Sequence, residues 1–332
     1  MRAIVLDGFG AADRMRIDEI ARPEPGPGEV RVKVAASSVN RPDLVQRAGH
    51  YAPPAGESEI LGLEVAGVID AVGDDVVDRA AGQRVFALVA GGGYAEYTIA
   101  RSDHCVDVPE KLSLQEAACI AENYLTAWLN VFELGRAEHA RSILLHGGGG
   151  GVHTAAVQLC RCFVPGAELY ATAAAAKLQR VRDLGVHHAF DYREQNFASE
   201  IRALTDKRGV DLILDHIGAK NLADNQRTLA VGGRLVSIGI MGGGKAELNI
   251  ATMMVKRQSM IGSVLRSRPP HEKAALIARF AERVMPRFAS GELRPIISSI
   301  VPLADAADAH RAMEAGEHFG KIVLAVSDES GR

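Results

Sequence analysis

The sequence predicts an α/β fold in which a doubly wound domain, built on a parallel sheet, is inserted into a β-rich domain. The chain has 332 residues, which suits two domains better than one core. From residue 142 onward, short apolar strands alternate with helical segments, a pattern typical of parallel βαβ units covered on both faces. The segments on either side differ from this block, which indicates that they pair into one domain that is split in sequence.

Composition and charge exclude several classes of protein. Hydrophobic residues make up 47% of the chain and charged residues 24%, and 38 Lys and Arg against 41 Asp and Glu give a formal net charge of −3. This balance argues against a nucleic-acid partner bound through a large basic face. The N-terminus lacks a signal-peptide pattern, and no window approaches the ~18 uncharged apolar residues of a membrane span. We therefore expect a cytoplasmic protein without a membrane partner.

The cysteines predict neither a disulfide scaffold nor a metal centre. Four are too few for a disulfide-rich fold of this length, and their positions match no zinc-ribbon spacing. We expect reduced, structural thiols at Cys105, Cys119, Cys160 and Cys162.

The flanking segments predict the β-rich domain. Residues 29–40 alternate like a half-buried strand, and turn-forming residues fill 23–29 and 51–58. Further strands are expected at 60–73, 84–100, 297–303 and 320–326, with a long helix beginning after residue 268 and another helix at 304–316.

The central segment supplies the alternating units. Residues 112–135 contain helical runs that end at Gly135. Strands are then expected at 142–146, 168–173, 188–192, 210–218 and 233–240, with helices at 152–163 and 175–185.

The stretch LLHGGGGGVHTAA, residues 144–156, carries the strongest functional signal. A buried strand ends at His146, a glycine run follows, and a helix begins at once. Glycine lets the backbone approach a pyrophosphate, and the helix N-terminus presents free N–H groups and a positive dipole end. Because a dinucleotide fingerprint requires this order, we expect cofactor contacts from Gly148, Gly150, Gly151, Val152 and His153.

His153 departs from the glycine fingerprint. The register that begins with Gly148 and Gly150 places this histidine where a third glycine normally permits close packing of helix and sheet. The imidazole either crowds the turn and weakens cofactor binding, hydrogen-bonds the cofactor, or is tolerated through a local backbone shift. The sequence leaves these alternatives open.

The residues after the second strand of the block favour NADPH over NADH. An NAD-binding domain places an Asp or Glu there to bind the ribose 2′-hydroxyl, but no acid lies between Thr172 and Lys177. Lys177 and Tyr192, with Arg193, are candidates to surround a 2′-phosphate instead. Lys177 also fits an ordinary solvated helix position.

Several segments together resemble the zinc-independent quinone oxidoreductase branch of the medium-chain dehydrogenase/reductase superfamily, which includes zeta-crystallin and is similar to the stress-inducible human quinone oxidoreductase. They are AASSVNRPDLVQRAGHY (35–51), LGLEVAGVIDAVG (61–73), AENYLTAW (121–128), GVDLILDHIG (209–218), GSVLRSR (262–268) and GKIVL (320–324). The resemblance implies a GroES-like catalytic domain, 1–118 with 267–332, and a Rossmann domain, 119–266. It also implies a cofactor site in the cleft between domains and a homodimer joined through the sheet edge at 259–265.

The resemblance also speaks against a metal. Zinc-dependent members of the superfamily place a Cys ligand where this chain has Asn40, and a His ligand where it has Leu63. A leucine side chain cannot coordinate zinc. We expect no metal ligand in this chain.

By the same resemblance, Asn40 and Tyr51 are the candidate catalytic residues. Asn40 is alternatively the cap of a helix that begins at Pro42, and Tyr51 is alternatively a loop aromatic packed on prolines 53 and 54. Asp43 is expected to be a charge in the first helical turn rather than a proton donor.

The resemblance places further residues near the cofactor. Thr126 is expected to touch the nicotinamide, and the triglycine segment 242–244 to form either a mobile loop or a plain surface turn. Arg266 and Lys321 are expected either to contact the cofactor or to form surface ion pairs. The remaining expected cofactor contacts are Gly239, Ile240, Met241, Ser263, Val264 and Leu265.

The predicted function is NADPH-dependent reduction of a quinone. Without a metal, hydride transfer to an activated acceptor needs mainly proximity and orientation. No general acid is evident in the sequence, so water is the expected source of the completing proton. The alternatives are an enoyl or enone reductase, acting on an α,β-unsaturated carbonyl or thioester, and a nucleotide-binding protein with little turnover.

Overall fold

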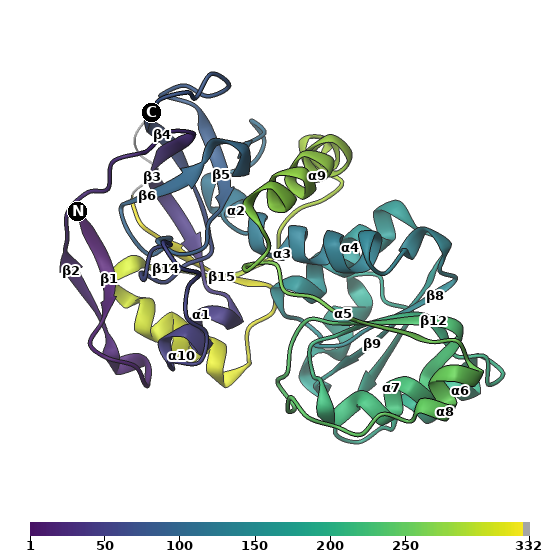
Figure 1. Cartoon of the computed structure of the whole chain (residues 1–332). Coiled ribbons are helices and arrows are strands. Elements are labelled where there is room, and N and C mark those ends of the chain that lie inside the picture. The colour runs from purple at the N-terminus through teal and green to yellow at the C-terminus, as the bar shows by residue number, and fades with distance from the viewer. Residues whose placement is uncertain (328–332) are drawn as a thin grey trace. The chain divides into compact units, whose positions relative to one another are not determined.

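The computed structural model describes residues 1–327, which form two compact units (Figure 1). Unit 1 comprises Met1–Leu125 and the chain from Arg266 onward, and unit 2 comprises Thr126–Leu265. The sequence placed the first division after residue 118 and the second after residue 266. Residues 328–332, the end of the second predicted segment, lie outside the described part of the chain.

Unit 1 is built on a mixed sheet with the strand order β14-β15-β3-β4-β5-β7, and β6 pairs with β3. Strand β15 from the end of the chain runs antiparallel to β3, with Val323 opposite Ser38, so the two flanking segments share one sheet. This confirms the predicted split domain. The strands are β3 (Glu29–Ser38), β4 (Glu64–Val72), β5 (Arg84–Leu88), β6 (Tyr97–Arg101), β7 (Cys105–Asp107), β14 (Ile297–Pro302) and β15 (Lys321–Ala325).

The single strand predicted at 84–100 is two strands, β5 and β6. The glycines between them cause the break, because the backbone there passes close to another segment: a Cβ on Gly91 would lie 2.2 Å from the carbonyl oxygen of Ser58. Gly92 also has a φ of +89°, in the left-handed region that favours glycine.

Helices and a small sheet complete unit 1. The antiparallel pair β1 (Arg2–Leu6) and β2 (Met15–Glu19) lies outside the main sheet. The predicted long helix is α9 (Pro270–Ser290), and its amphipathic sequence buries Leu276, Ile277 and Phe280. The other helices are α1 (Arg41–Arg47), α2 (Leu114–Ala117) and α10 (Ala306–Ala315), with short 3-10 turns η1 (Ala12–Arg14), η2 (Ser102–His104) and η7 (Leu303–Asp305).

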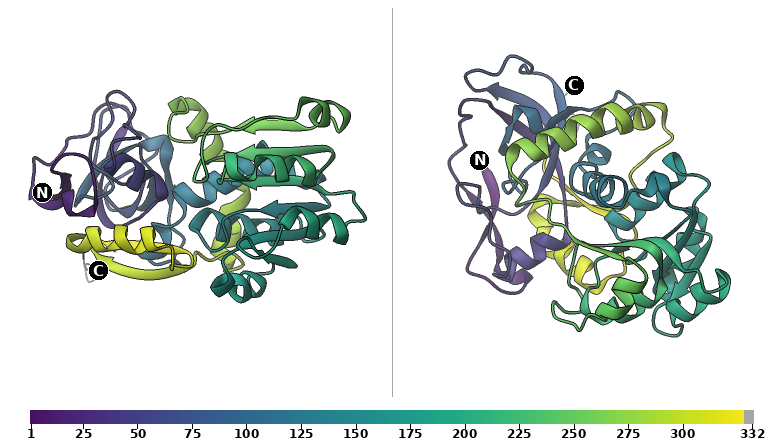
Figure 2. Two further views of the ribbon diagram at one scale, coloured as in Figure 1. Left: turned by 90° about the horizontal axis from the view of Figure 1, so that it is seen from below. Right: turned by 45° about the vertical axis from the view of Figure 1, so that its right-hand side comes forward.

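Unit 2 contains, within the described residues, a six-stranded sheet of order β10-β9-β8-β11-β12-β13 in which every pairing is parallel (Figure 2, left). Following the chain, β9 and β10 are added on one side of β8, and β11, β12 and β13 on the other. This is the doubly wound order, and its switch point lies between β8 and β11. The predicted Rossmann architecture is confirmed. The strands are β8 (Ser142–Leu145), β9 (Glu168–Ala173), β10 (His188–Asp191), β11 (Val210–Asp215), β12 (Leu229–Ser237) and β13 (Ser259–Gly262).

Helices cover both faces of this sheet. On one face α6 and α7 pack together, and Phe197 and Ile201 of α6 join a core with Leu144 and Ile213 of the strands. Helix α4 lies on the opposite face (Figure 1). The helices are α4 (Gly151–Phe163), α5 (Leu178–Asp183), α6 (Phe197–Leu204), α7 (Leu222–Thr228) and α8 (Ile250–Val255), with 3-10 turns η4 (Ala137–His139), η5 (Ala175–Lys177) and η6 (Ala219–Asn221).

The helical runs predicted at 112–135 include α3 (Ala121–Ala127), which continues as a π-helix, η3 (Trp128–Glu133). The π-helix is anchored by aromatic packing, because the ring of Trp128 stacks on Phe132 with centroids 4.6 Å apart and meets Phe163 of α4 edge-on. Among residues 1–327, no helix has both the length and the apolar character needed to cross a membrane.

Candidate functional site

The glycine run forms a tight turn at the point where the sheet of unit 2 reverses direction. Strand β8 ends at Leu145, and α4 begins at Gly151. A Cβ on Gly148 would lie 2.2 Å from Cβ of Ala173, and one on Gly147 would lie 1.6 Å from Nε2 of His216. Gly148 therefore requires glycine for packing against the end of β9, and Gly147 requires it because its φ is +87°.

The turn presents an anion-binding surface at the start of α4. The amides of Gly151, Val152 and His153 belong to the first helical turn, where no intrahelical acceptor is available. In this 13-residue helix, the dipole adds a positive partial charge at the same end. A Cβ on Gly150 would approach no atom closer than 3.7 Å, so the surface beside it is open within the described chain. This arrangement fits a pyrophosphate.

His153 lies inside the turn and is fully buried. Its Nδ1 accepts a hydrogen bond from the Gly149 N–H at 3.3 Å, so the proton of the neutral ring is on Nε2. Burial lowers the pKa of His153 to about 3, with smaller contributions from His216, His146 and Lys177. The Nε2 atom has no hydrogen-bond partner among the described residues. The imidazole thus supports the turn through Nδ1, and its Nε2–H is a buried donor without an acceptor among the described residues.

A second buried histidine fixes the strand ends behind the turn. The Oδ1 of Asn225 can only accept, so the His146 Nε2–H donates to it at 2.8 Å. His146 Nδ1 then accepts from the hydroxyl of Thr172, also at 2.8 Å. Burial lowers the pKa of His146 to about 4, so the ring is neutral and ties β8 to β9 and α7.

Lys177 and Tyr192 lie at the carboxyl ends of neighbouring strands. Lys177 ends η5, which follows β9, and Tyr192 follows β10 with 47% of its surface exposed. The guanidinium of Arg193 is 5.6 Å from the centre of the Tyr192 ring. Burial lowers the pKa of Lys177, and Arg180 adds to the effect. These side chains share the sheet edge that carries the glycine turn.

The other predicted cofactor residues of unit 2 lie in loops at that same edge. Gly239, Ile240 and Met241 follow β12, where Ile240 and Met241 are exposed. The Met241 N–H donates to the carbonyl of His216 at 3.2 Å, and the Gly242 N–H donates to that of Ile217 at 2.6 Å. The triglycine segment is therefore hydrogen-bonded to the loop after β11.

The segment after β13 adds the last predicted contacts in unit 2. Ser263 donates its N–H to the carbonyl of Ser237 at 3.0 Å, and its hydroxyl is buried without a partner among the described residues. Val264 is half exposed and Leu265 is buried. Thr126 lies on α3, and its hydroxyl is likewise buried without a partner in the part of the chain that is described.

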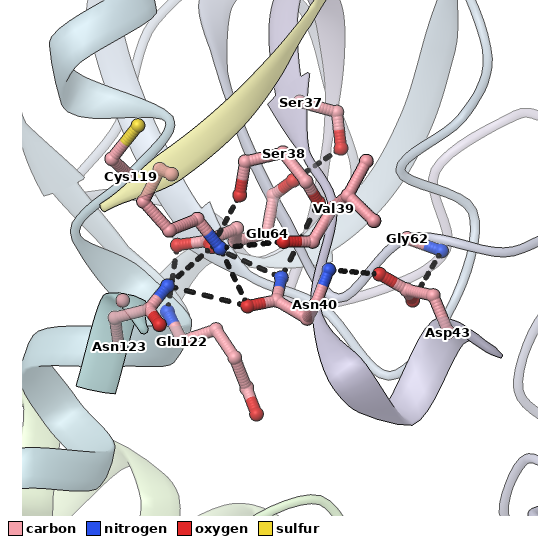
Figure 3. Close-up of polar contacts among 12 residues, drawn as sticks. Ser37, Ser38, Val39, Asn40, Asp43, Gly62, Glu64, Cys119, Glu122 and Asn123 are labelled. Atoms are coloured by element: carbon pink, nitrogen blue, oxygen red, sulfur yellow. Dashed lines mark hydrogen bonds and ion pairs between the residues drawn. The ribbon is translucent and has the colours of Figure 1, made fainter. Parts of the chain in front are cut away.

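A buried polar network centred on Glu64 occupies the interior of unit 1 (Figure 3). Oε1 of Glu64 accepts from the Ser38 hydroxyl at 2.5 Å and from the side-chain amides of Asn40 and Asn123 at 3.1 and 3.0 Å. Its Oε2 accepts from the Glu122 N–H at 2.8 Å. The network thereby joins β3, β4 and the first turn of α3.

Lys321 supplies the positive charge of this network. Its Nζ donates to Glu64 Oε1 at 3.0 Å, to Asn40 Oδ1 at 2.6 Å and to the carbonyl of Val39 at 3.0 Å. Three acceptors use all the hydrogens of an ammonium group. Lys321 is buried and has no hydrogen left for a phosphate, so it is neither the cofactor contact nor the surface ion pair that the sequence suggested.

Asn40 and Asp43 are also interior groups. The backbone of Asn40 caps α1, while its side-chain amide is committed to the network. Asp43 is fully buried and accepts from the Asn40 N–H at 2.7 Å, the Tyr94 hydroxyl at 3.1 Å and the Gly62 N–H at 3.2 Å. Burial raises the pKa of Asp43 to about 6, although these hydrogen bonds and the charge of Lys321 act to lower it. Asp43 lies in the first turn of α1, as the sequence predicted, and its carboxyl group is buried there.

Tyr51 lies against Arg266 and is half-buried. The guanidinium carbon is 5.1 Å from the ring centre, and the guanidinium donates to the carbonyl of Ala90, to Gln46 Oε1 and to the carbonyl of Tyr51. Arg266 is thus a buried residue that holds Tyr51 in place. Burial raises the pKa of Tyr51, Glu122 adds to the effect, and Arg266 opposes it. The hydroxyl of Tyr51 makes no hydrogen bond to the described residues.

Glu122 interacts electrostatically with Tyr51 and was not identified as a site residue from the sequence. It follows Ala121 at the start of α3, and its side chain points away from the Glu64 network (Figure 3). Burial raises the pKa of Glu122 to about 8, and the charges of Glu64 and Asp43 act in the same direction. The available signal was a single charge in the otherwise uncharged run 117–132.

The positions that hold zinc in related dehydrogenases carry no suitable ligands here. The side chain of Asn40 is committed to its neighbours, and Leu63 is a buried hydrocarbon. Across residues 1–327, no group of three His, Cys, Asp or Glu side chains is placed to hold a metal ion.

Comparison with known proteins connects both units to dehydrogenases. The family model "Alcohol dehydrogenase GroES-like domain" matches residues 26–110, and the model "Zinc-binding dehydrogenase" matches residues 184–324. Human quinone oxidoreductase is 33% identical over 329 residues, which cover 98% of this chain and 97% of the relative. The human synaptic vesicle membrane protein VAT-1 homolog is 31% identical over 347 residues, 99% of this chain and 87% of the relative.

Solved structures agree with the fold over nearly the whole chain. A mycobacterial protein in complex with NADPH matches with a TM-score of 0.87 and 28% identity, covering 98% of this chain and all of the other. The JamJ enoyl reductase matches with a TM-score of 0.89 and 25% identity, covering 98% of this chain and 99% of the other. These relatives include proteins named for reduction of quinones and of enoyl groups.

Proposed function

Because the chain belongs to the medium-chain dehydrogenase/reductase superfamily, with quinone oxidoreductases among its relatives, we propose that it is an NADPH-dependent reductase of a quinone or a related activated acceptor. The observation that carries the proposal is the glycine turn at the reversal point of a doubly wound sheet. It combines free amides at the start of α4 with the unpaired Nε2–H of His153. Bound there, NADPH would supply the hydride that reduces the acceptor.

The residues beyond the turn support NADPH over NADH. No carboxylate follows β9 to bind a ribose 2′-hydroxyl, because residues 173–176 are all alanine. Lys177 and Tyr192, with Arg193 behind the ring, place a cation and a hydroxyl at the ends of β9 and β10. A 2′-phosphate would gain a charge-assisted hydrogen bond from Lys177.

Unit 1 supplies the groups for the acceptor. The Tyr51 ring offers a planar, half-buried surface held by Arg266, and its hydroxyl is free to bind a ligand within the described chain. An aromatic acceptor such as a quinone can stack on such a ring. Asn40 acts indirectly, since its amide is fully engaged and its role is to hold Lys321 and Glu64 in place. We therefore propose Tyr51 for acceptor binding and Asn40 as a positioning residue.

Reduction of an enoyl or enone group is the second candidate. The observation in its favour is the similarity to the JamJ enoyl reductase over 98% of the chain. The reaction needs the same hydride donor and an oriented carbonyl group, and therefore the same groups in both units.

One experiment separates these functions. The dissociation constants of NADPH and NADH are measured by cofactor fluorescence, and NADPH oxidation is then followed with a quinone panel and an enoyl-thioester panel at one protein concentration. Tighter binding of NADPH and turnover with quinones support the proposal. Turnover with thioesters alone assigns the second candidate, and binding without turnover leaves a nucleotide-binding protein.

A further inference from the structure

Glu122 has an unusual position at the edge of the Glu64 network. Its backbone N–H donates to Oε2 of Glu64 at 2.8 Å, which fixes the start of α3. Its side chain extends in the opposite sense, away from Glu64, Asn40 and Asn123 (Figure 3). Neither carboxyl oxygen accepts a hydrogen bond from the described residues, although the neighbouring carboxylates of Glu64 and Asp43 are each held by several donors.

Within the described residues, the hydrogen bonds of the cations around Glu122 go to groups other than its carboxyl oxygens. Lys321 donates to Glu64, Asn40 and the carbonyl of Val39, and Arg266 donates to Ala90, Gln46 and Tyr51. Lys273 of α9 donates to the carbonyl of Arg266 at 3.3 Å. The titratable and charged groups that interact with Glu122 are Asp43, Tyr51, Glu64, Arg266, Lys273 and Lys321.

This environment favours the neutral acid. Burial and the carboxylates of Glu64 and Asp43 disfavour a further negative charge, and they outweigh Lys321 and Arg266. The result is a pKa of about 8, so the carboxyl group of Glu122 keeps its proton at neutral pH. A carboxylic acid held in this way can act as a general acid.

The direction of the side chain connects Glu122 with the rest of the candidate site. Glu122 and Thr126 are four residues apart on α3, and such positions lie on one face of a helix. Thr126 is the residue expected at the nicotinamide. Tyr51, proposed for acceptor binding, interacts electrostatically with Glu122. The acid therefore shares a helix face with Thr126, and its charge is felt by the tyrosine proposed for acceptor binding.

We propose that Glu122 is the proton donor that completes reduction of the acceptor, a role that rests on the proposed function. The acceptor gains two electrons and one hydrogen as hydride, which leaves an added negative charge on its carbonyl oxygen. The O–H bond of Glu122 then breaks, and its proton forms an O–H bond with that oxygen. The resulting carboxylate takes a proton from water before the next turnover. Water thus replenishes Glu122 instead of protonating the acceptor.

The test uses the full-length variant Glu122→Gln, which keeps the size of the side chain but has no acidic proton. Loss of a general acid is expected to lower kcat by about a hundredfold or more. The NADPH dissociation constant is expected to stay within about twofold, because Glu122 is not part of the phosphate site. The kcat of the wild type is expected to fall as pH rises through about 8, and Glu122→Gln is expected to lose this step. Glu133→Gln, on the adjoining π-helix, is the matched control and should keep the wild-type profile.

Infrared spectroscopy of the cofactor-free protein gives a readout independent of activity. A protonated carboxyl band that persists at neutral pH, disappears above about pH 8 and is absent from Glu122→Gln would identify the acid. If Glu122→Gln does not fold, Glu122→Asp is used, which should retain part of the rate and a shifted pH step.

The outcomes separate this role from the proposed function. A wild type that reduces no acceptor would overturn the proposed function, and with it this role. An active wild type whose kcat and pH profile are unchanged in Glu122→Gln would overturn the role of Glu122 alone. A carboxyl band at neutral pH that survives in Glu122→Gln would likewise count against it.

Discussion

The ammonium nitrogen of Lys321 lies 3.0 Å from Oε1 of Glu64, and both side chains are buried. Glu64 begins β4, in the first segment of unit 1, whereas Lys321 begins β15, after the whole of unit 2 has been inserted. The ion pair therefore cross-links the two segments of a split domain. It also orients Asn40 and the start of α3, where Glu122 lies.

Removing one partner of this pair should destabilise unit 1 strongly. Lys321→Met leaves a buried, unpaired carboxylate, and we expect the free energy of unfolding to fall by about 3–5 kcal/mol in urea denaturation. Arg16→Met is the control, because its partner Asp18 is exposed and such a solvent-screened pair contributes little to stability. The double variant Lys321→Met/Glu64→Gln should recover part of the loss. Equal, small losses for Lys321→Met and the control would contradict a structural role of the pair.

His310 should make the protein less stable in mild acid. Its Nδ1 accepts from Arg47 and its Nε2–H donates to the Tyr94 hydroxyl, and burial, with a smaller effect of Arg47, lowers its pKa to about 3 from 6.5. Its stabilising contribution is therefore full above pH 6.5 and is lost as pH falls toward 3. In that window the unfolded state binds one more proton, which lowers the free energy of unfolding by about 1.4 kcal/mol per pH unit.

Urea denaturation between about pH 6 and about pH 4 tests this contribution. His310→Gln should reduce the slope of the free energy of unfolding against pH. His139→Gln, at an exposed position, should leave that slope unchanged. A slope that is the same in both variants would mean that His310 does not contribute.

Lys177 should distinguish the two nicotinamide cofactors. Lys177→Ala removes a charge-assisted contact with a 2′-phosphate, so we expect NADPH binding to weaken by about 1–2 kcal/mol and NADH binding to stay nearly unchanged. Fluorescence titration with each cofactor measures both values. Arg180→Ala, on the following helix, is the control for general electrostatic attraction. Equal losses for NADPH and NADH would show that Lys177 acts through the fold.

His153 should support cofactor binding without any dependence on pH. His153→Gly and His153→Ala both remove the acceptor for the Gly149 N–H, and loss of one such hydrogen bond is worth about 1 kcal/mol, or about fivefold in affinity. Because the pKa of about 3 keeps the ring neutral, the change in the NADPH dissociation constant should be the same at about pH 6 and about pH 8. Tighter binding by the variants would restore the view that the imidazole crowds the turn.

The edge of the sheet in unit 2 should form a dimer contact. Strand β13 pairs with β12 alone within the described residues, which leaves an edge that a second copy could extend. Light scattering at micromolar concentration should give about twice the chain mass of 35.3 kDa. Ile261→Lys places a charge on this edge and should shift the mass toward the monomer. A wild type of about 35 kDa would exclude this assembly.

The sequence predicted the glycine turn of unit 2 better than the buried network of unit 1, and the reason is the range of the interactions. The turn after His146 depends on a strand, glycines and a helix that are consecutive in the chain, so local rules were sufficient. Glu64, Asn123 and Lys321 are far apart in sequence, and no local pattern connects them. Their partners could not be known before the sheet was assembled, and for that reason the surface ion pairs offered as one alternative for Arg266 and Lys321 were wrong.

Periodicity and glycine placement in the sequence alone determined an inserted doubly wound domain, the β-rich flanks and the glycine turn, because these features follow from backbone geometry over short distances. Only the tertiary structure decided the charge states and hydrogen-bond partners of the buried groups. Burial brought Asp43, Glu64 and Lys321 together, raised the pKa of Glu122 and kept His153 neutral. Desolvation depends on everything that packs around a side chain, so a linear pattern carries no measure of it.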